Sequence, residues 1–392
     1  MNIPLKRTVG YPVNENFFLF GPRGTGKSSW LAAQFPQSQT LDLLDSDLQI
    51  KLMAKPSLLE SLIEKGSGTP HQPIIIDEVQ KIPSLLDEVH RLIEKKKKYF
   101  ILTGSSARKL KREGTNLLGG RAITCSMNPF SSLELGNQFD FSRALKSGLL
   151  PKAYLGKQHE SYLASYVTTY LKEEVQQEGL VRSLEGFTRF LQTASFSQGS
   201  LLNKVKVAEE SSIGRRAAEG YFEILKDLLL SIELPVFTKR ANRKMVKHSK
   251  FYFFDTGVFR QLRPRGPLDS DAEINGAAFE TLILQDLKAM NDSARHGTKQ
   301  SEAWNADIYF WQPSQKKEVD FVLYGPKIFT AIEVKATSRL RKEDFSGLNQ
   351  FHEDYPEAKR ILIYTGNKSE NHEGISIITA KDWFSLPLHK RL

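Results

Sequence analysis

The sequence contains almost no cysteine and no long apolar run. Cys125 is the single cysteine among 392 residues, which excludes an internal disulfide. No apolar stretch approaches the ~20 residues that a membrane-spanning helix needs. The first residues carry neither the basic n-region nor the apolar h-region of a secretory signal peptide. We therefore expect a cytoplasmic protein with no membrane partner.

The charge balance is basic. The chain has 55 Lys and Arg residues against 45 Asp and Glu residues, a formal net charge of +10. Such a balance favours polyanionic partners, nucleic acids among them, over acidic proteins. Because basic proteins without a nucleic-acid partner are common, the charge alone indicates no function. The length allows two to three domains, each with its own core.

The most informative motif is GPRGTGKS at residues 21–28, between an apolar run at 17–20 and a helix-forming segment at 29–33. In such a loop the backbone N–H groups turn toward phosphate oxygens, Lys27 supplies positive charge, and the Ser28 hydroxyl can ligate Mg²⁺. The alternative is a chance loop without a ligand. The residues predicted to bind the nucleotide here are Gly21, Pro22, Arg23, Gly24, Thr25, Gly26, Lys27, Ser28 and Ser29.

A second motif, IIIDE at residues 74–78, ends an unbroken apolar run with two carboxylates. A buried parallel strand would deliver them to the carboxyl edge of its sheet, where ligands bind. Asp77 would hold Mg²⁺ through water, and Glu78 would orient and deprotonate the water that attacks the γ-phosphate. The alternative is that both carboxylates only cap the next helix.

A third predicted strand at 99–102 ends in the polar residues 103–106. If this strand neighbours the Asp77 strand, Thr103 and Ser105 would lie beside the γ-phosphate, where a hydroxyl can sense the state of the nucleotide. An ordinary strand-to-helix turn explains the same residues.

Arg121 follows two glycines and precedes a further apparent strand. It is our first candidate for an arginine that completes the ATP site of a neighbouring subunit. Arg108 and Arg143 are the rival candidates.

From Val13 to about Gly136 the chain resembles the AAA+ superfamily ATPases of bacteria and archaea, in the branch fused to a largely uncharacterised C-terminal domain. The resemblance rests on GPRGTGKS, IIIDEVQ, LTGSSA, LLGGRA and NPFSSLEL in this order. It implies an α/β fold with a P-loop parallel sheet, and ATP as the nucleotide. It also implies a homo-oligomer with ATP sites between subunits, a hexamer being one candidate form.

We predict three domains: an ATPase domain with a helical lid at 1–178, a winged-helix region at 179–262, and an α/β domain at 263–392. The lid would end in a helix with Tyr162 and Tyr166, and these tyrosines are better explained as a packed helix face than as a base-stacking platform.

The middle region has two short helices, at 205–210 and 217–225, that flank a polar turn. Two strands, at 229–237 and 250–255, follow around a basic hairpin. This pattern indicates a winged helix, and the resemblance to the family extends to it. Its cations would bind DNA, or the module would serve only for packing between domains. The residues predicted to contact DNA are Arg215 and Arg216, which open the recognition helix, and Lys239, Arg240, Arg243 and Lys244 in the hairpin.

The last region resembles the PD-(D/E)xK nuclease core. The resemblance rests on Glu280 in a helical segment, Asp320 in EVDFVL, and Glu333 and Lys335 in the strand that follows. A two-residue turn at 325–326 would place Asp320 and Glu333 as diagonal neighbours on one face of a sheet.

These carboxylates would share Mg²⁺ or Mn²⁺, with Glu280 as a third ligand, and Lys335 would stabilise charge or position a water. The alternative is an exposed charged face with a Glu-Lys pair of little energetic weight.

Together these patterns predict an ATP-hydrolysing protein that binds and remodels DNA, with branched DNA as an attractive substrate and nuclease activity as an added hypothesis. The alternative is an ATP-gated module that grips nucleic acid or protein with an inactive nuclease fold. A protein-remodelling ATPase is a third hypothesis, supported only by the AAA+ resemblance.

Overall fold

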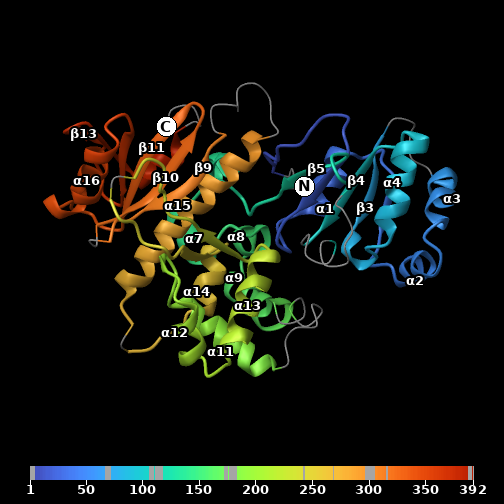
Figure 1. Ribbon diagram of the computed structural model, residues 1–392, viewed down its shortest axis with the longest axis horizontal. Coiled ribbons are helices and arrows are strands. Elements are labelled where there is room, and N and C mark those ends of the chain that lie inside the picture. The colour runs from blue at the N-terminus through green and yellow to red at the C-terminus, as the bar shows by residue number, and fades with distance from the viewer. Residues whose placement is uncertain are drawn as a thin grey trace.

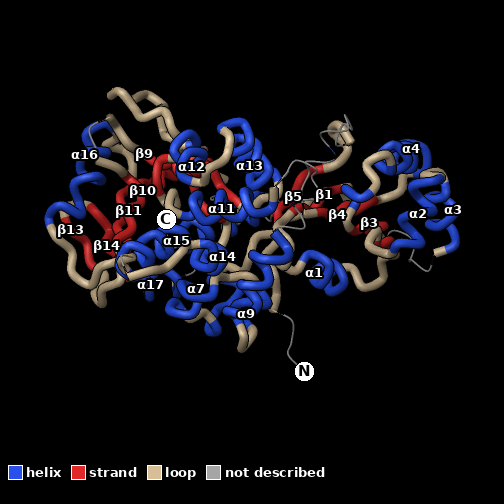
Figure 2. Tube along the Cα trace, turned by 90° about the horizontal axis from the view of Figure 1, so that it is seen from below, coloured by secondary structure: helices blue, strands red, loops and turns tan. Residues whose placement is uncertain are grey.

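The structure is a computed structural model that describes residues 5–66, 72–105, 110, 118–171, 175, 183–241, 243–267, 269–295, 305–314, 317–386 and 391. A smaller lobe holds the N-terminal sheet, and a larger lobe holds most of the remaining elements (Figure 1). The same division is visible after a turn of 90° (Figure 2). No helix within the described ranges is both long and apolar enough to cross a membrane. Arg108 lies outside the described residues.

The smaller lobe is built on a parallel five-stranded sheet with the order β2-β3-β4-β1-β5. Its strands are β1 (Phe17–Phe20), β2 (Thr40–Asp42), β3 (Ile74–Asp77), β4 (Phe100–Gly104) and β5 (Ile123–Ser126). Its helices are α1 (Lys27–Gln34), α2 (Ser46–Ala54), α3 (Leu58–Lys65), the 3-10 turn η1 (Val79–Lys81) and α4 (Leu85–Lys96). Alternation along β1 packs Phe18 into a core with α2, α3 and α4, and Phe17 into a core with Trp30 of α1. Both faces are therefore covered, which explains the unbroken apolar strands.

The helices after β5 belong mainly to the larger lobe. They are α6 (Ser132–Leu135), the 3-10 turn η2 (Gly136–Gln138), α7 (Phe141–Ser147), α8 (Pro151–Leu155), α9 (His159–Ser165) and the π-helix η3 (Tyr166–Tyr170). Leu135 and Ala144 share a core with the C-terminal region. The Tyr166 ring lies 4.9 Å from the Tyr170 ring and 6.4 Å from the Phe254 ring. These tyrosines form a packed helix face, as expected.

The middle region alternates helices with a small antiparallel sheet of order β6-β8-β7. Its elements are α11 (Leu184–Ser195), β6 (Ser200–Leu201), α12 (Lys204–Glu210), α13 (Arg215–Asp227), β7 (Ser231–Leu234), β8 (Lys250–Phe253) and α14 (Thr256–Leu262). The predicted strand at 229–237 is shorter than expected, because its end leaves this sheet. The Phe237 N–H donates to the Phe310 carbonyl over 2.7 Å, and the Val246 N–H donates to the Gln312 carbonyl over 3.2 Å.

The C-terminal region is a mixed six-stranded sheet of order β13-β14-β12-β11-β10-β9. Its elements are α15 (Asp271–Arg295), β9 (Asp307–Trp311), β10 (Val319–Gly325), β11 (Ile328–Lys335), the 3-10 turn η5 (Lys342–Phe345), α16 (Ser346–Asp354), β12 (Lys359–Tyr364), β13 (Glu370–His372), β14 (Ile375–Thr379) and α17 (Ala380–Ser385). Leu282 of α15 and Trp383 of α17 share one core, and Phe351 of α16 lies in another. Helices therefore cover both sides of the sheet.

The expected turn between β10 and β11 is wrong by two residues in register. Gly325 pairs with Ile328, so the turn consists of Pro326 and Lys327, and Phe321 pairs with Ile332. Residue 325 in this strand is a glycine because a Cβ there would lie 2.4 Å from the Asn305 carbonyl oxygen. A shift of two keeps every side chain on its face.

In the observed register Asp320 is therefore directly opposite Glu333 rather than diagonal to it. The predicted common face survives, but it is buried and not an exposed charged face: Asp320 is 4% and Glu333 is 3% exposed.

Candidate functional site

The phosphate-binding loop connects β1 to α1 as predicted. Gly24 and Gly26 have φ values of +83° and +94°, in the left-handed region that favours glycine. The Thr25 hydroxyl donates to the Pro22 carbonyl over 2.8 Å, and the Lys27 ammonium donates to the Gly21 carbonyl over 2.7 Å. The loop is therefore held in shape by its own side chains before any phosphate binds.

Asp77 lies where the residues predicted to bind the nucleotide meet. β4 neighbours both β3 and β1, so the expected adjacency of the Asp77 and Thr103 strands is confirmed. The Ser28 hydroxyl donates to Asp77 Oδ2 over 2.7 Å, and the Thr103 hydroxyl donates to Asp77 Oδ1. Asp77 is 8% exposed, whereas Ser28 is exposed. This hydroxyl and carboxylate pair fits Mg²⁺, which prefers oxygen ligands and retains several waters.

Glu78 is held beside this centre by a neighbour that the sequence analysis missed. Its backbone is left-handed, with φ +58°. The Gln80 amide donates to the Glu78 carboxylate and, over 3.3 Å, to the Ser105 hydroxyl. A Cβ on Gly104 would lie 2.3 Å from Gln80 Oε1, which explains the glycine at the end of β4. Gln80 thus links the predicted catalytic carboxylate to the predicted sensor strand.

Two further residues, Arg7 and Tyr166, hold the loop from outside. Arg7 donates to the Thr25 carbonyl over 2.6 Å and forms a buried ion pair with Glu134 at 3.0 Å. Glu134 belongs to a capping box with Ser131, a signature that the spacing SxxE predicts. The Tyr166 hydroxyl donates to the Arg23 carbonyl over 3.0 Å.

Neither described candidate for the arginine in trans faces this loop within its own chain. Arg121 pairs with Glu94 and donates to the Gly119 carbonyl over 3.1 Å. Arg143 donates to the Gly156 carbonyl over 2.7 Å. A role for either in a neighbouring subunit stays a prediction.

The second candidate site, the acidic cluster, consists of Glu280, Glu318, Asp320 and Glu333. A buried lysine that the sequence analysis did not consider lies among them: Lys250, 1% exposed, at the start of β8. Its Nζ lies 3.1 Å from Glu280 Oε1, 3.2 Å from Asp320 Oδ1 and 3.5 Å from Glu318 Oε1. The Tyr252 hydroxyl also donates to Glu280.

Burial, with repulsion from the neighbouring carboxylates, raises the pKa values of three glutamates of the acidic cluster, Glu280, Glu318 and Glu333. Burial, followed by the charge of Asp320, raises the pKa of Glu280 to about 7, against the opposing effect of Lys250. The same two causes raise the pKa of Glu333 well above its usual range. Burial lowers the pKa of Lys250, but the surrounding acidic groups outweigh it and hold that pKa well above its ordinary value. Lys250 is therefore charged.

Glu333 and Lys335 lie together as predicted. The Lys335 ammonium donates to Glu333 Oε1, while the buried Glu333 Oε2 has no hydrogen-bond partner among the residues that the structure describes. Asp320 Oδ2 accepts from the Val334 N–H over 2.9 Å. Within the described ranges, no three His, Cys, Asp or Glu side chains are grouped as a metal site. With an ammonium between Glu280 and Asp320, the cluster does not fit the predicted divalent metal.

Two candidate DNA contacts of the hairpin, Arg243 and Lys239, lie against the C-terminal region. Arg243 forms ion pairs with Asp354 at 2.9 Å and Glu353 at 2.6 Å. The Lys239 ammonium lies 4.3 Å from the centre of the Tyr324 ring. These contacts agree with the packing alternative for the hairpin.

The other candidate DNA contacts are exposed. Arg215 forms an ion pair on α13 with Glu219 at 3.0 Å, and the side chains of Arg216, Arg240 and Lys244 are exposed as well. Contact of any of these residues with DNA stays a prediction.

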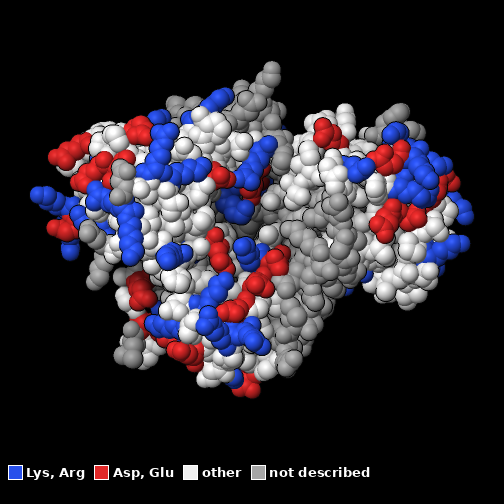
Figure 3. Space-filling view, in the orientation of Figure 1, with Lys and Arg blue, Asp and Glu red and all other residues white. Residues whose placement is uncertain are grey.

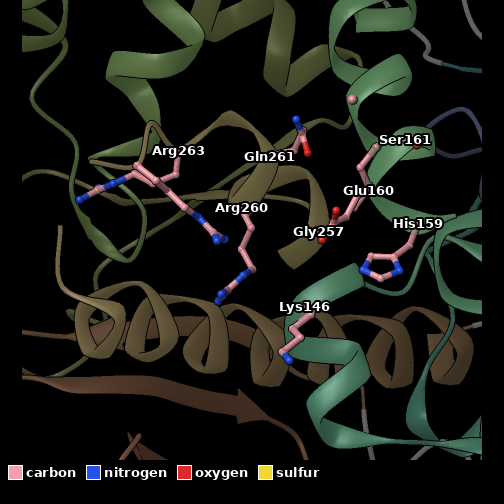
Figure 4. A pocket seen from close by; sticks show the side chains of 11 residues that line it. Lys146, His159, Glu160, Ser161, Gly257, Arg260, Gln261 and Arg263 are labelled. Atoms are coloured by element: carbon pink, nitrogen blue, oxygen red, sulfur yellow. The ribbon is translucent and has the colours of Figure 1, made fainter. Parts of the chain in front are cut away.

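A cavity of about 720 Å³ lies between α7, α9, α14 and the loop after α14, and the sequence analysis missed it. Lys146 and Arg260 extend into it from α7 and α14 (Figure 4). Burial lowers the pKa of Arg260, and the nearby charge of Arg265 lowers it further. Arg260 and Arg265 therefore lie close enough to repel each other. Arg263 forms an ion pair with Glu273 at 2.9 Å. The remaining residues that line the cavity are His159, Glu160, Ser161, Leu163, Ala164, Gly257 and Gln261.

Two of these cations carry uncompensated charge. Lys146 and Arg265 are exposed and make no side-chain ion pair or hydrogen bond with the part of the chain that the structure describes. Elsewhere Lys and Arg gather over the end of the smaller lobe that carries α4, with acidic side chains beside them (Figure 3). There Lys96 pairs with Glu60 at 3.0 Å. The cavity differs because it offers cations that no described carboxylate neutralises.

Family models match three consecutive parts of the chain. Residues 13–136 match an AAA domain, residues 138–269 match a domain of unknown function (DUF8612), and residues 275–383 match another domain of unknown function (DUF4143). Uncharacterized proteins of Mycobacterium bovis and Mycobacterium tuberculosis are each 24% identical over 330 residues, covering 82% of this chain and 70% of theirs.

Solved structures are similar only at a low level. The ORC1 protein of Aeropyrum pernix in complex with DNA is 12% identical, covering 63% of this chain and 86% of that chain, with a TM-score of 0.27. NtrX of Brucella abortus is 13% identical, covering 74% and 61%, with a TM-score of 0.24. TM-scores at this level carry no inference. The AAA domain match, by contrast, supports ATPase activity for the N-terminal region.

Proposed function

We propose that the protein hydrolyses ATP in the loop between β1 and α1 and couples this cycle to binding and remodelling of DNA. The observation that carries the first part is the meeting of Ser28, Thr103 and Asp77 at one carboxylate. Ser28 and Asp77 would hold Mg²⁺, which supplies positive charge to the β- and γ-phosphates when bound. Lys27 would turn from the Gly21 carbonyl to the phosphates.

Glu78 would accept the proton of the attacking water. Its carboxylate lies one residue beyond the magnesium ligand, and Gln80 holds it from the side of Ser105. Such a base is worth about 10²–10⁴-fold in rate. Thr103 and Ser105 would report the presence of the γ-phosphate to β4. In an oligomer, for which a hexamer is one candidate, Arg121 would leave Glu94 and complete the neighbour's site.

The basic cavity supports the DNA part of the proposal. Lys146, Arg260 and Arg265 present three positive charges in a cavity whose described lining includes one carboxylate, that of Glu160, and phosphodiester groups stabilise such an excess of positive charge. The cavity is also lined by α9, which continues directly into η3, where Tyr166 holds the phosphate loop. A phosphate chain in the cavity and a nucleotide in the loop would therefore contact the same helix.

The middle region supports a winged-helix interpretation. Its order of helix, strand, two helices and two strands matches that module, and α13 begins at Arg215 as a recognition helix would. Because the hairpin lies against β9, DNA binding by this region would use α13 rather than the hairpin.

The experiment measures anisotropy of labelled duplex, forked and four-way DNA at several salt concentrations. We expect Lys146→Glu with Arg265→Glu to weaken binding of all substrates and to flatten the salt dependence, by about one unit of slope per lost phosphate contact. Arg215→Glu with Arg216→Glu is the matched pair on α13. Absence of salt-sensitive DNA binding and of DNA-stimulated ATPase in the unmodified protein would remove the DNA proposal.

A second candidate function is an ATP-gated module that binds nucleic acid or protein through an inactive nuclease fold. The position of Lys250 in the acidic cluster favours it. Under this alternative hydrolysis is slow and nucleotide state sets affinity. DNA affinity measured with ATP and with ADP, together with a strand-displacement assay, separates the two functions.

A further inference from the structure

The acidic cluster contains its own cation. Three carboxylates from α15 and from the start of β10 surround the Lys250 ammonium within 3.5 Å, and Lys250 comes from the sheet of the middle region. We propose that Lys250 permanently takes the place of a divalent metal there, and that the C-terminal sheet therefore binds the middle region instead of cleaving nucleic acid. This inference does not depend on the proposed ATPase or DNA-binding function.

The position of Lys250 is fixed by backbone pairing on both sides. It pairs with Leu234 of β7 and with Leu201 of β6, so the residue cannot slide along its strand without breaking both ladders. Tyr252, two residues later on the same face, donates its hydroxyl to Glu280. β8 therefore supplies two donors to one carboxylate of the acidic cluster.

Electrostatics require this cation. A buried carboxylate without a partner pays a large desolvation penalty, and three adjacent carboxylates also repel one another. The ammonium offsets both costs, and its three N–H donors match the three carboxylates within reach. A metal ion would have to displace this ammonium, which is 1% exposed, from the three carboxylates that it contacts.

The consequence for chemistry is direct. Metal-dependent phosphodiester cleavage needs an ion that polarises the phosphate and activates a water. An ammonium supplies charge but no open coordination position. Removal of Lys250 would leave Glu280 and Asp320 without this ammonium, and Glu333 Oε2, which has no hydrogen-bond partner among the described residues, could then join them around a metal.

The test measures Mn²⁺ binding to the full-length, nucleotide-free protein by electron paramagnetic resonance. We expect no Asp320-dependent site in the unmodified protein. Lys250→Ala should gain one Mn²⁺ site. We expect its affinity to be at least about 100-fold higher than any Asp320-dependent affinity of the unmodified protein, because breaking a buried pair costs about 3–5 kcal/mol that a bound metal can recover. Addition of Asp320→Asn should abolish it, and Lys335→Ala, which removes the other lysine of the region, should gain none.

Two results would overturn the proposal. One is a Mn²⁺ site in the unmodified protein that disappears with Asp320→Asn and persists with Asp77→Asn. The other is a folded Lys250→Ala protein, judged by circular dichroism, that gains no site. If Lys250→Ala does not fold without metal, Mn²⁺ should restore its folding, and failure to do so also counts against the proposal.

Discussion

The two lobes each bury an aspartate near the end of a strand, but they neutralise it in opposite ways. Asp77 accepts hydrogen bonds from two hydroxyls, one of them exposed. Asp320 lies against the buried ammonium of Lys250. Neutral hydroxyls leave the negative charge of Asp77 for an incoming cation, whereas the lysine cancels that of Asp320 from within the chain.

A set of potential metal ligands therefore indicates a metal site only when no charged side chain of the protein lies between the ligands. Both sets satisfy their sequence patterns. Only the first is open to a metal, because its donors are uncharged and can exchange partners without leaving a buried charge behind.

Substitution of Glu78 by Gln should have the largest effect. We expect ATP hydrolysis to fall by about 10²–10⁴-fold while ATP stays bound, because the amide cannot accept the proton of the attacking water. Phosphate release and filter binding of labelled ATP measure the two quantities. Hydrolysis at the normal rate would contradict the role of Glu78.

Substitution of Lys250 by Met should unfold the larger lobe more easily. Loss of the ammonium leaves buried carboxylates uncompensated, and we expect the free energy of unfolding to fall by about 3–5 kcal/mol. Urea denaturation followed by tryptophan fluorescence measures it. Lys335→Met is the control, since Lys335 is partly exposed and, among the described residues, forms an ion pair with Glu333 alone. An equal loss in both variants would remove the distinction between the two lysines.

The stability of the larger lobe should depend on pH through Glu280. Its carboxyl has a pKa of about 7 when folded and ionises near its ordinary 4.5 when unfolded. The unfolded state therefore releases the proton first, and the stability contributed by Glu280 is full below 4.5 and lost as the pH rises through 7. Relative to Glu280→Gln, we expect a loss of up to about 3 kcal/mol.

Denaturation curves of both proteins at pH 4.5, 6 and 7.5 test this dependence. The groups that face Glu280 are Lys250, Tyr252, Asp320 and Glu318, and all remain in both proteins. A parallel pH dependence in the two proteins would show that Glu280 does not titrate as stated.

Substitution of Arg243 by Ala should have the smallest effect. We expect only a small decrease in stability, measured as the midpoint of urea denaturation, because the ion pairs with Asp354 and Glu353 are partly exposed, and no change in DNA affinity. A loss of DNA affinity similar to that of the variant with Lys146→Glu and Arg265→Glu would show that the hairpin contacts DNA.

Local spacing and strand pattern allowed much of the nucleotide site to be predicted. The loop at 21–28, the Asp77 strand and its adjacency to the Thr103 strand all agree with the structure. Gln80 and Arg7 escaped prediction, because nothing in a single sequence relates a glutamine or an N-terminal arginine to a loop that folds against it later. The candidate acidic cluster was found, but its partner Lys250 was not.

The pattern of residues alone indicated the strands that end at Asp77 and Thr103, the face of β10 that carries Asp320, and the place of the phosphate loop. These features follow from periodicity and from backbone preferences within a few residues. Only the tertiary structure decided that Lys250 enters the acidic cluster, that the hairpin pairs with β9, and that Lys146 and Arg265 share a cavity. The physical reason is that each of these contacts joins segments far apart in the chain, where position is set by packing of the whole lobe rather than by local chemistry.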